Sequence, residues 1–104
     1  MDDVRVYTGT LVADLRLPWA ASLKQRRQVL RSVVDRLRRD EFSVAQVGPS
    51  QLRQRVFLAV TAVSGNPGKL AQRLDAAERI LYASEFEVGA IHRDSTSWTG
   101  PSFP

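Results

Sequence analysis

The residue types that carry most enzyme chemistry are sparse in this chain of 104 residues. His92 is the single histidine and there is no cysteine, so neither a thiolate metal site nor thiol chemistry is predicted. No serine stands in a recognisable nucleophile motif. Acidic pairs at 2–3, 40–41 and 85/87 lie near expected element ends, where solvated caps are the favoured interpretation. The sequence predicts a protein that is not an enzyme, with no metal and no cofactor.

Segment 64–69, SGNPGK, contains a G-x-x-G pattern at the start of an expected helix. A helix N-terminus can hold an anion. However, this loop joins a strand to a helix, and the Walker pattern is absent. We therefore favour a simple turn and helix cap, with Asn66 as the cap and Pro67 as the first helical residue.

Positive charge is concentrated in residues 22–40, SLKQRRQVLRSVVDRLRRD. This segment holds seven Lys or Arg and two Asp, a net +5, whereas the whole chain is +4, so the remainder sums to −1. At helical spacing, four basic side chains align along one flank over about 21 Å. Such a row could neutralise nucleic acid phosphates. The predicted nucleic-acid-binding residues are Lys24, Arg27, Arg31 and Arg38, with Arg39 auxiliary.

The alternative interpretation is a solvated helix face, with Asp35 pairing locally to Arg31 and Arg38. Arg26 is a separate case because it falls within the apolar stripe of the same helix. A buried arginine needs a partner, so pairing with Asp14 or Glu87 is expected. Contact with a ligand phosphate or carboxylate is the less favoured alternative.

The elements that must position these side chains follow from hydrophobic periodicity. Residues 4–17, 42–48, 52–64 and 85–93 alternate or run apolar and are predicted strands. Two helices are predicted between them, the first capped by Ser22 and the second opening at Asn66. Their expected buried residues are Leu23, Leu30, Val33, Val34 and Leu37 in the first helix, and Leu70, Leu74, Ala77 and Leu81 in the second.

This β-α-β-β-α-β order predicts an α+β, ferredoxin-like fold, with a four-stranded antiparallel sheet and both helices on one face. The two long strands are expected at the centre. A single domain is predicted over residues 1–93, followed by a flexible tail over 94–104 that is rich in Ser, Thr, Gly and Pro. No signal peptide or membrane-spanning run is recognised, so a cytoplasmic protein with no membrane partner is expected.

The face of the sheet opposite the helices is predicted to be open. Related RNA-binding sheets stack bases on aromatics from two central strands, whereas only Phe57 is available here. A mixed apolar and charged face suits a homodimer instead. Alternatively, Trp98 and Phe103 fold back to cover it. The predicted open-sheet interface is Val12, Arg55, Phe57 and Val63.

Several segments resemble the YlxP-like proteins, a family of small uncharacterised bacterial proteins with a domain of unknown function. Ser22–Leu30 resembles their S-L-K-x-[KR]-R-x-V-[LI] segment, FSVAQVG their V-x-V-A-E-V strand, and QLRQRVFLAV their D-L-W-Q-R strand. The resemblance covers roughly residues 4–91; Gln46, Ser50 and Arg53 depart from it. It implies a ferredoxin-like fold. Because members are often encoded beside translation-initiation and ribosome-maturation genes, it also implies a link to RNA or the ribosome.

Together these observations favour a non-enzymatic RNA- or ribosome-associated accessory factor that uses a basic helix. The alternative is a homodimeric protein-interaction or small-ligand regulatory module that acts through the open sheet face.

Overall fold

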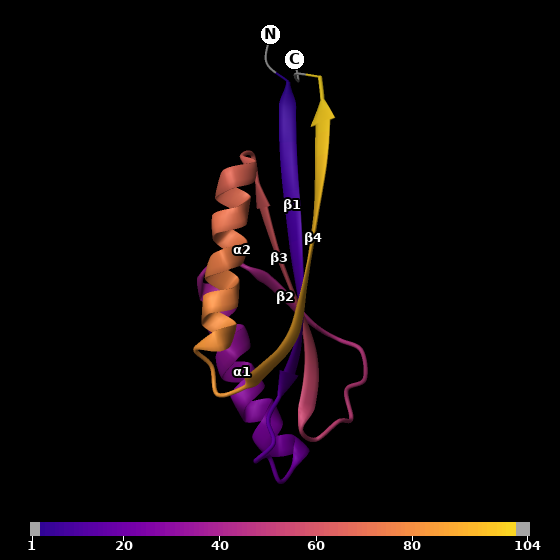
Figure 1. Cartoon of the computed structure of the whole chain (residues 1–104), viewed down its shortest axis with the longest axis vertical. Helices are drawn as coiled ribbons and strands as arrows, with labels where there is room; N and C mark the ends of the chain where they lie inside the picture. The colour runs from indigo at the N-terminus through magenta and orange to yellow at the C-terminus, as the bar shows by residue number, and fades with distance from the viewer. Residues whose placement is uncertain (1–2, 102–104) are drawn as a thin grey trace.

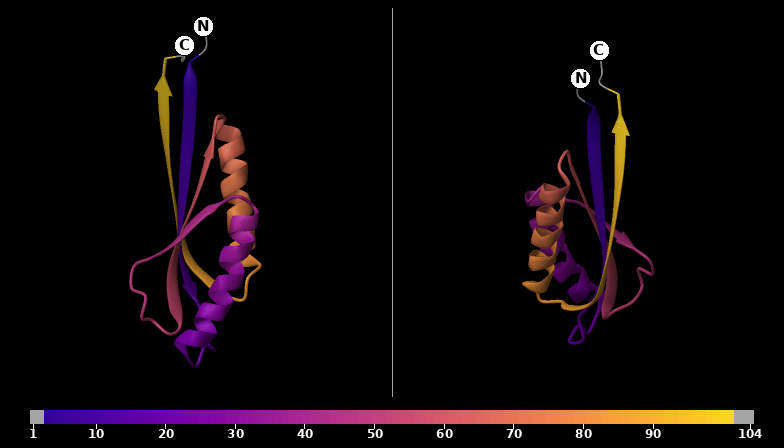
Figure 2. Two further views of the ribbon diagram at one scale, coloured as in Figure 1. Left: turned by 180° about the vertical axis from the view of Figure 1, so that it is seen from behind. Right: turned by 45° about the horizontal axis from the view of Figure 1, so that its top comes forward.

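The computed structural model describes residues 3–101, which form a four-stranded antiparallel sheet with two helices on one of its faces (Figures 1 and 2). Strand order is β2-β3-β1-β4, so the two long strands β1 and β3 are central, as predicted. The ferredoxin-like prediction is thereby confirmed. The elements are β1 (Val4–Arg16), α1 (Leu23–Arg39), β2 (Ser43–Val47), β3 (Arg55–Ser64), α2 (Pro67–Tyr82) and β4 (Glu87–Gly100).

Strand alternation places the core between the sheet and the helices. Successive side chains of a strand point to opposite faces, and the apolar set of β1 and β3 is the fully buried one. The helices bury one stripe each against it. In α1, Val29 joins the predicted stripe, whereas Leu23 and Val34 are only half-buried. The sheet contributes Leu11, Ala13, Leu15, Val56, Leu58, Val60 and Ala62; the helices contribute Val29, Leu30, Val33, Leu37, Leu70, Leu74, Ala77 and Leu81.

Both helices begin at the predicted caps. The Ser22 hydroxyl accepts from the backbone N–H of Gln25 at 3.2 Å, and Gln25 Oε1 accepts in return from the N–H of Ala21. The Asn66 side chain accepts from the N–H of Lys69 at 3.0 Å. These bonds satisfy N–H groups that lack an intrahelical partner.

Helix α1 ends where Glu41 adopts a left-handed backbone, with φ of 68°. This conformation turns the chain so that the N–H of Phe42 donates to the carbonyl of Leu37 at 3.0 Å. A left-handed residue directly after a helix C-terminus is a common helix-capping motif, and glycine is the usual residue at that position. It brings Phe42 into the core directly before β2.

The loop between β2 and β3 packs against the start of α1. The Gln54 side chain donates to the carbonyls of Pro18 and Ala20, and the backbone N–H of Leu17 donates to the Gln54 carbonyl at 2.8 Å. The connection from β1 into α1 is therefore held by a loop more than thirty residues further along the sequence.

Strand β4 is longer than predicted. The sequence analysis ends the last strand and the domain at Arg93, whereas Asp94–Gly100 continue the strand and pair with Val4–Thr10 of β1. Because β3 ends opposite Tyr7, the first residues of β1 pair only with β4, and their backbone groups need these partners. The result is a two-stranded extension beyond α2 (Figure 1). Residues 102–104 of the predicted tail lie outside the described range.

Candidate nucleic-acid interface

The four main residues of the predicted nucleic-acid contact share one flank of α1. Lys24, Arg27, Arg31 and Arg38, here called the basic row, are all exposed and lie within roughly 60° of one another around the axis of an ideal helix. Within residues 3–101, no ion pair involves any of them. The local pairing of Asp35 with Arg31 and Arg38 is therefore absent from the described part of the chain. The basic row is a line of charges free to meet an external anion.

Arg39 does not belong to this row. It lies roughly 90° away around the helix and lines a groove between α1 and α2, together with Arg36 and Arg79. The structure thus places Arg39 on a different side of α1 from the basic row. Its auxiliary role in nucleic-acid contact stays a prediction. Arg36 makes the α1 ion pair, from Nε to Asp40 Oδ2 at 3.7 Å.

Arg26 is buried, with 1% of its surface exposed. Neither Asp14 nor Glu87, its expected partners, forms an ion pair with it. Its Nη2 donates to the Ser50 carbonyl in the β2–β3 loop at 3.2 Å. Nε and Nη1 have no hydrogen-bond partner within residues 3–101. Burial, and secondarily the charge of Arg27, lowers the pKa of Arg26. The predicted pairing with Asp14 or Glu87 is wrong because Asp14 projects from the opposite face of the sheet, where Arg55 holds it.

On the open face, Arg55 ties the central strands together. Its Nε and Nη2 donate to the two carboxylate oxygens of Asp14 at 2.9 Å each, and its guanidinium lies 4.7 Å from the Phe57 ring centroid. The hydrogen bonds from Arg55 hold the pKa of Asp14 below its ordinary value. A Cβ at Gly48 would lie 3.2 Å from Cδ2 of Phe57, so that turn lies against the ring. Phe57 is half-buried, with Arg55 over its ring and the turn at Gly48 beside it, so it offers little surface for a base.

The residues of the predicted open-sheet interface fall into two separate groups along the central strands. Val12 pairs with Ala59, which lies two residues from Phe57 and four residues from Arg55 along β3. Val63 lies about 20 Å from Phe57 along β3, at 3.3 Å per residue. Val63 is 66% exposed and Trp98 of β4, opposite Val6, is 53% exposed. Trp98 therefore joins the open face without covering it, and Phe103 lies outside the described residues.

Other candidate chemistry stays sparse. Residues 3–101 contain no group of three His, Asp or Glu side chains that could hold a metal ion. Neither α1 nor α2 is long and apolar enough to cross a membrane. The G-x-x-G segment forms the predicted cap of α2, with the Asn66 side chain bonded to Lys69.

Sequence reasoning missed the grouping of Arg36, Arg39 and Arg79. Arg36 and Arg39 are three residues apart and so share one flank of α1, which the sequence could have indicated. Their approach to Arg79 depends on how the two helices pack, and no local pattern indicates it.

Curated proteins give no match. Among solved structures, the chain is similar to "De novo designed protein Foldit4", with a TM-score of 0.47, 9% sequence identity, and coverage of 88% of this chain and 96% of that chain. A family sequence profile matches residues 8–93, which include most of β1, all of α1, β2, β3 and α2, and the start of β4. The chain belongs to the family described as "Protein of unknown function (DUF503)".

Proposed function

We propose that this protein is a non-enzymatic, cytoplasmic accessory factor that binds RNA, in a ribosomal context, through the basic row of α1. The main support for the proposal is that the charges of the basic row are exposed and unpaired in the described part of the chain. Four cationic side chains follow one exposed flank of a single rigid helix, and within residues 3–101 no carboxylate pairs with any of them. Uncompensated charges on a rigid element suit sequence-independent contact with phosphates.

The dimensions of the row support an RNA strand as its partner. From Lys24 to Arg38 the row extends about 21 Å along the helix axis, enough for several successive phosphates. The resemblance of Ser22–Leu30 to the YlxP-like proteins supports a ribosomal setting, since genes of that family are often found beside translation genes. Contact would be through phosphates, because within residues 3–101 the open sheet face offers the exposed Trp98 but no second exposed aromatic for base stacking.

The test is co-sedimentation of the purified protein with ribosomal subunits and with naked ribosomal RNA, at low and at moderate salt. A variant carrying Lys24→Glu, Arg31→Glu and Arg38→Glu reverses the row. Its matched control carries Arg5→Glu, Arg53→Glu and Lys69→Glu, three exposed basic residues away from α1. Both variants change the net charge equally, so the comparison isolates where the charge lies.

The proposal predicts salt-sensitive co-sedimentation that is lost in the row variant and largely kept in the control. Circular dichroism and a melting curve establish that both variants fold. Equal losses in the two variants would mean that only net charge matters, and no co-sedimentation of the wild type would mean that the row is a solvated helix face.

A second candidate is a homodimer through the open sheet face, with a second copy of the chain as the occupant. Exposed apolar surface at Val63 and Trp98 favours it, because large apolar side chains on an uncovered sheet face are a feature of interfaces. The charged pair of Asp14 and Arg55 on the same face is already neutralised internally, so desolvating it costs less than burying free charges.

Sedimentation equilibrium of the wild type and of Val63→Arg distinguishes this candidate. A dimer that uses this face predicts a twofold mass for the wild type and a monomeric mass for the variant, with RNA binding unchanged. Val63 is exposed, so the substitution leaves the fold intact. A monomeric wild type across the accessible concentration range rejects the dimer.

A further inference from the structure

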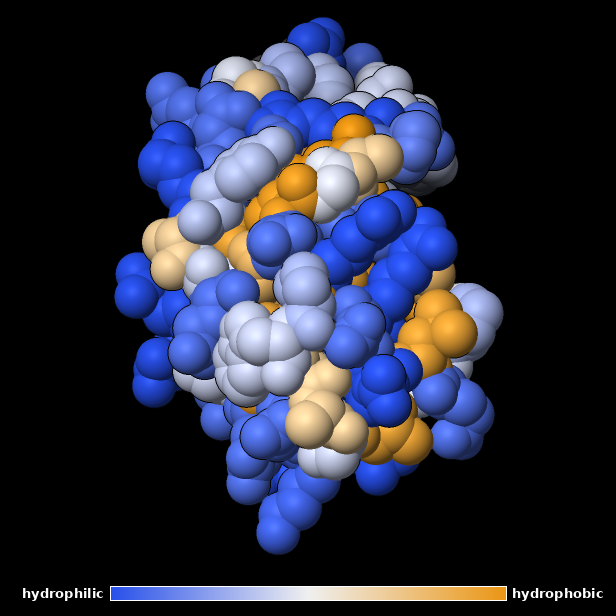
Figure 3. Space-filling model, turned by 60° about the horizontal axis from the view of Figure 1, so that its bottom comes forward, coloured by the Kyte–Doolittle hydropathy of each residue, from blue (hydrophilic) through white to orange (hydrophobic). Residues whose placement is uncertain are grey.

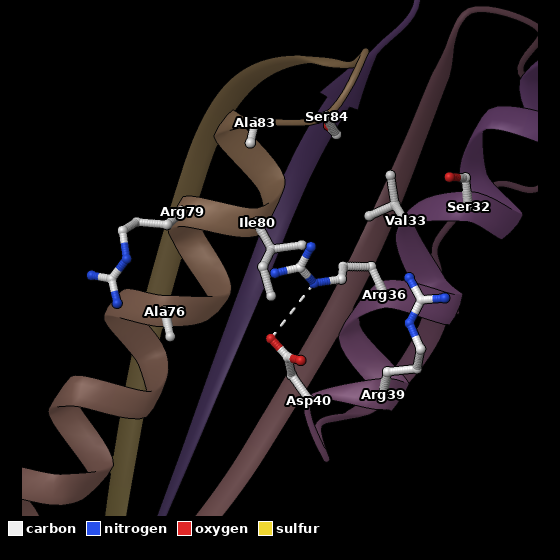
Figure 4. Close-up of a pocket in the computed structure, with 10 residues that line it drawn as sticks. All are labelled: Ser32, Val33, Arg36, Arg39, Asp40, Ala76, Arg79, Ile80, Ala83 and Ser84. Carbon is white, nitrogen blue, oxygen red and sulfur yellow. Dashed lines mark ion pairs between the residues drawn. The ribbon is translucent and has the colours of Figure 1, made fainter.

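The second halves of α1 and α2 enclose a groove on the outer side of the helix layer, with a volume of about 570 Å³ (Figure 4). At its far end Arg73 of α2 donates to the Asp40 carbonyl at 2.7 Å and ties the two helices together. The volume falls within the range of small-molecule sites, about 300–1,000 Å³. The groove is lined by Ser32, Val33, Arg36, Arg39, Asp40, Ala76, Arg79, Ile80, Ala83 and Ser84.

The lining combines an apolar floor with a cationic rim. Val33, Ala76 and Ile80 form the floor and are buried or half-buried. On the face of the molecule drawn in Figure 3, hydrophilic residues dominate and apolar residues form patches between them. The groove combines a concave apolar surface with several guanidinium groups.

The charge of the rim is not balanced. Three arginines, Arg36, Arg39 and Arg79, line the groove together with one carboxylate, that of Asp40, which leaves two positive charges. Asp40 pairs with Arg36 at 3.7 Å, whereas Arg39 and Arg79 have no ion pair within residues 3–101. Arg36 and Arg39 lie in the last turn of α1, and Arg79 lies in the last turn of α2. The dipoles of both helices therefore favour these cations and add negative potential at the groove, but they supply no full negative charge to balance the arginines.

Figure 4 shows how these side chains lie. The Arg36 guanidinium extends from α1 across the groove toward Ile80, and Arg39 stands beside it on the same helix. The Arg79 guanidinium stands on α2 and points away from Arg36. Because Arg79 is exposed, its side chain changes rotamer within nanoseconds and can turn toward a bound anion.

We propose that this inter-helix groove binds a small organic phosphate monoester, with the phosphate held by Arg36 and Arg39, and Arg79 closing over it. A phosphate dianion balances the two uncompensated charges, and guanidinium groups bind phosphate oxygens through paired hydrogen bonds. An apolar ring or chain of the same ligand lies on Val33, Ala76 and Ile80. The site is separate from the basic row, because it occupies the other flank of α1, and it stands whether or not the protein binds RNA.

Isothermal titration at constant ionic strength tests this with three probes: phenyl phosphate, inorganic phosphate and phenol. Phenyl phosphate at up to about 10 mM saturates a site of millimolar affinity. The proposal predicts saturable binding of phenyl phosphate, weaker binding of inorganic phosphate, and none of phenol. Absence of saturable phenyl phosphate binding overturns it. Equal affinity for the two phosphates overturns the role of the apolar floor.

Two variants with equal charge change locate the site. Arg36→Gln with Arg79→Gln removes two charges from the groove and should weaken phenyl phosphate binding by about tenfold or more, the effect of a lost charged contact. Lys24→Gln with Arg31→Gln removes two charges from the basic row. This variant should change the affinity for phenyl phosphate by no more than about twofold, because solvent screens charges on the far flank of α1. Equal weakening in both variants would mean that net charge alone attracts the anion.

The same two variants separate this site from the proposed RNA contact. Co-sedimentation with ribosomal RNA should fall for Lys24→Gln with Arg31→Gln and persist for Arg36→Gln with Arg79→Gln. If the groove variant instead loses RNA and phenyl phosphate together, the groove is part of an RNA surface and the small-ligand proposal fails.

Discussion

Arg55 and Asp14, which are forty-one residues apart in the sequence, form a two-point ion pair across the central strands β3 and β1. Arg16 adds a second positive charge, 3.6 Å from the same carboxylate. A Cβ at Gly89 would lie 3.3 Å from Asp14 Oδ2, so β4 packs closely against the Asp14 carboxylate near its bulge. This cluster is the best-defined polar feature of the open sheet face, and its Arg55–Asp14 pair links the two central strands.

The pH dependence of stability should report this pair. Arg55 holds the pKa of Asp14 below its ordinary value of 3.8, so the pair's contribution is complete above pH 3.8 and is lost as pH falls through the lowered pKa. Asp14→Asn lacks that contribution at every pH. The difference in unfolding free energy between wild type and Asp14→Asn, measured in urea, should therefore shrink as pH falls below 3.8. Glu85→Gln, at an exposed carboxylate without an ion pair in the described chain, serves as the control.

Arg26→Met should stabilise the protein. Two buried donor atoms of Arg26 have no partner within residues 3–101, and each such group costs about 1–3 kcal/mol. Methionine fills a similar volume without polar atoms, so we expect the unfolding free energy to rise by about 1–3 kcal/mol.

Guanidinium chloride unfolding of Arg26→Met and of Arg26→Ala measures this effect. Arg26→Ala leaves a cavity and should be less stable than Arg26→Met by about 2–3 kcal/mol. Destabilisation by Arg26→Met itself would show that the buried guanidinium has a charged partner in solution.

Glu41→Gly should also raise stability, by about 1 kcal/mol, because glycine adopts a left-handed backbone without the steric cost that a Cβ imposes. The φ of 68° at Glu41 is the structural basis. Glu41→Ala removes the same carboxylate but keeps the Cβ, so its melting temperature should stay close to that of the wild type. Equal stabilisation by both substitutions would assign the effect to charge.

The salt dependence of RNA binding should report the number of phosphates that the basic row contacts. Each neutralised phosphate contributes about −0.7 to the slope of log affinity against log salt for a single strand, so four contacts give a slope of about −3. Replacing Lys24, Arg31 and Arg38 together by glutamine should reduce it to about −1. A slope that is unchanged in this variant, measured by fluorescence anisotropy with a labelled ribosomal RNA fragment, would place the contact elsewhere.

The extent of β4 and the partner of Arg26 both differ from what the sequence predicts. Residues 94–100 are polar, with turn-forming types among them, and their composition indicates a loop. They form a strand because β1 already lies alongside and offers backbone partners from Val4 to Thr10. For Arg26, helical periodicity identified its buried position correctly, but only the tertiary structure showed that the nearest acceptor is the Ser50 carbonyl.

The sequence by itself determined the order of elements, both helix caps, the buried stripes and the concentration of charge on α1. These depend on neighbours within about one helical turn or on strand alternation, so the chain encodes them locally. Only the tertiary structure decided that Arg36 and Arg39 share a groove with Arg79 of α2, that Asp14 pairs with Arg55, and that Trp98 lies exposed beside Val6. Those relationships follow from sheet register and helix packing between segments far apart in the chain, which no local pattern specifies.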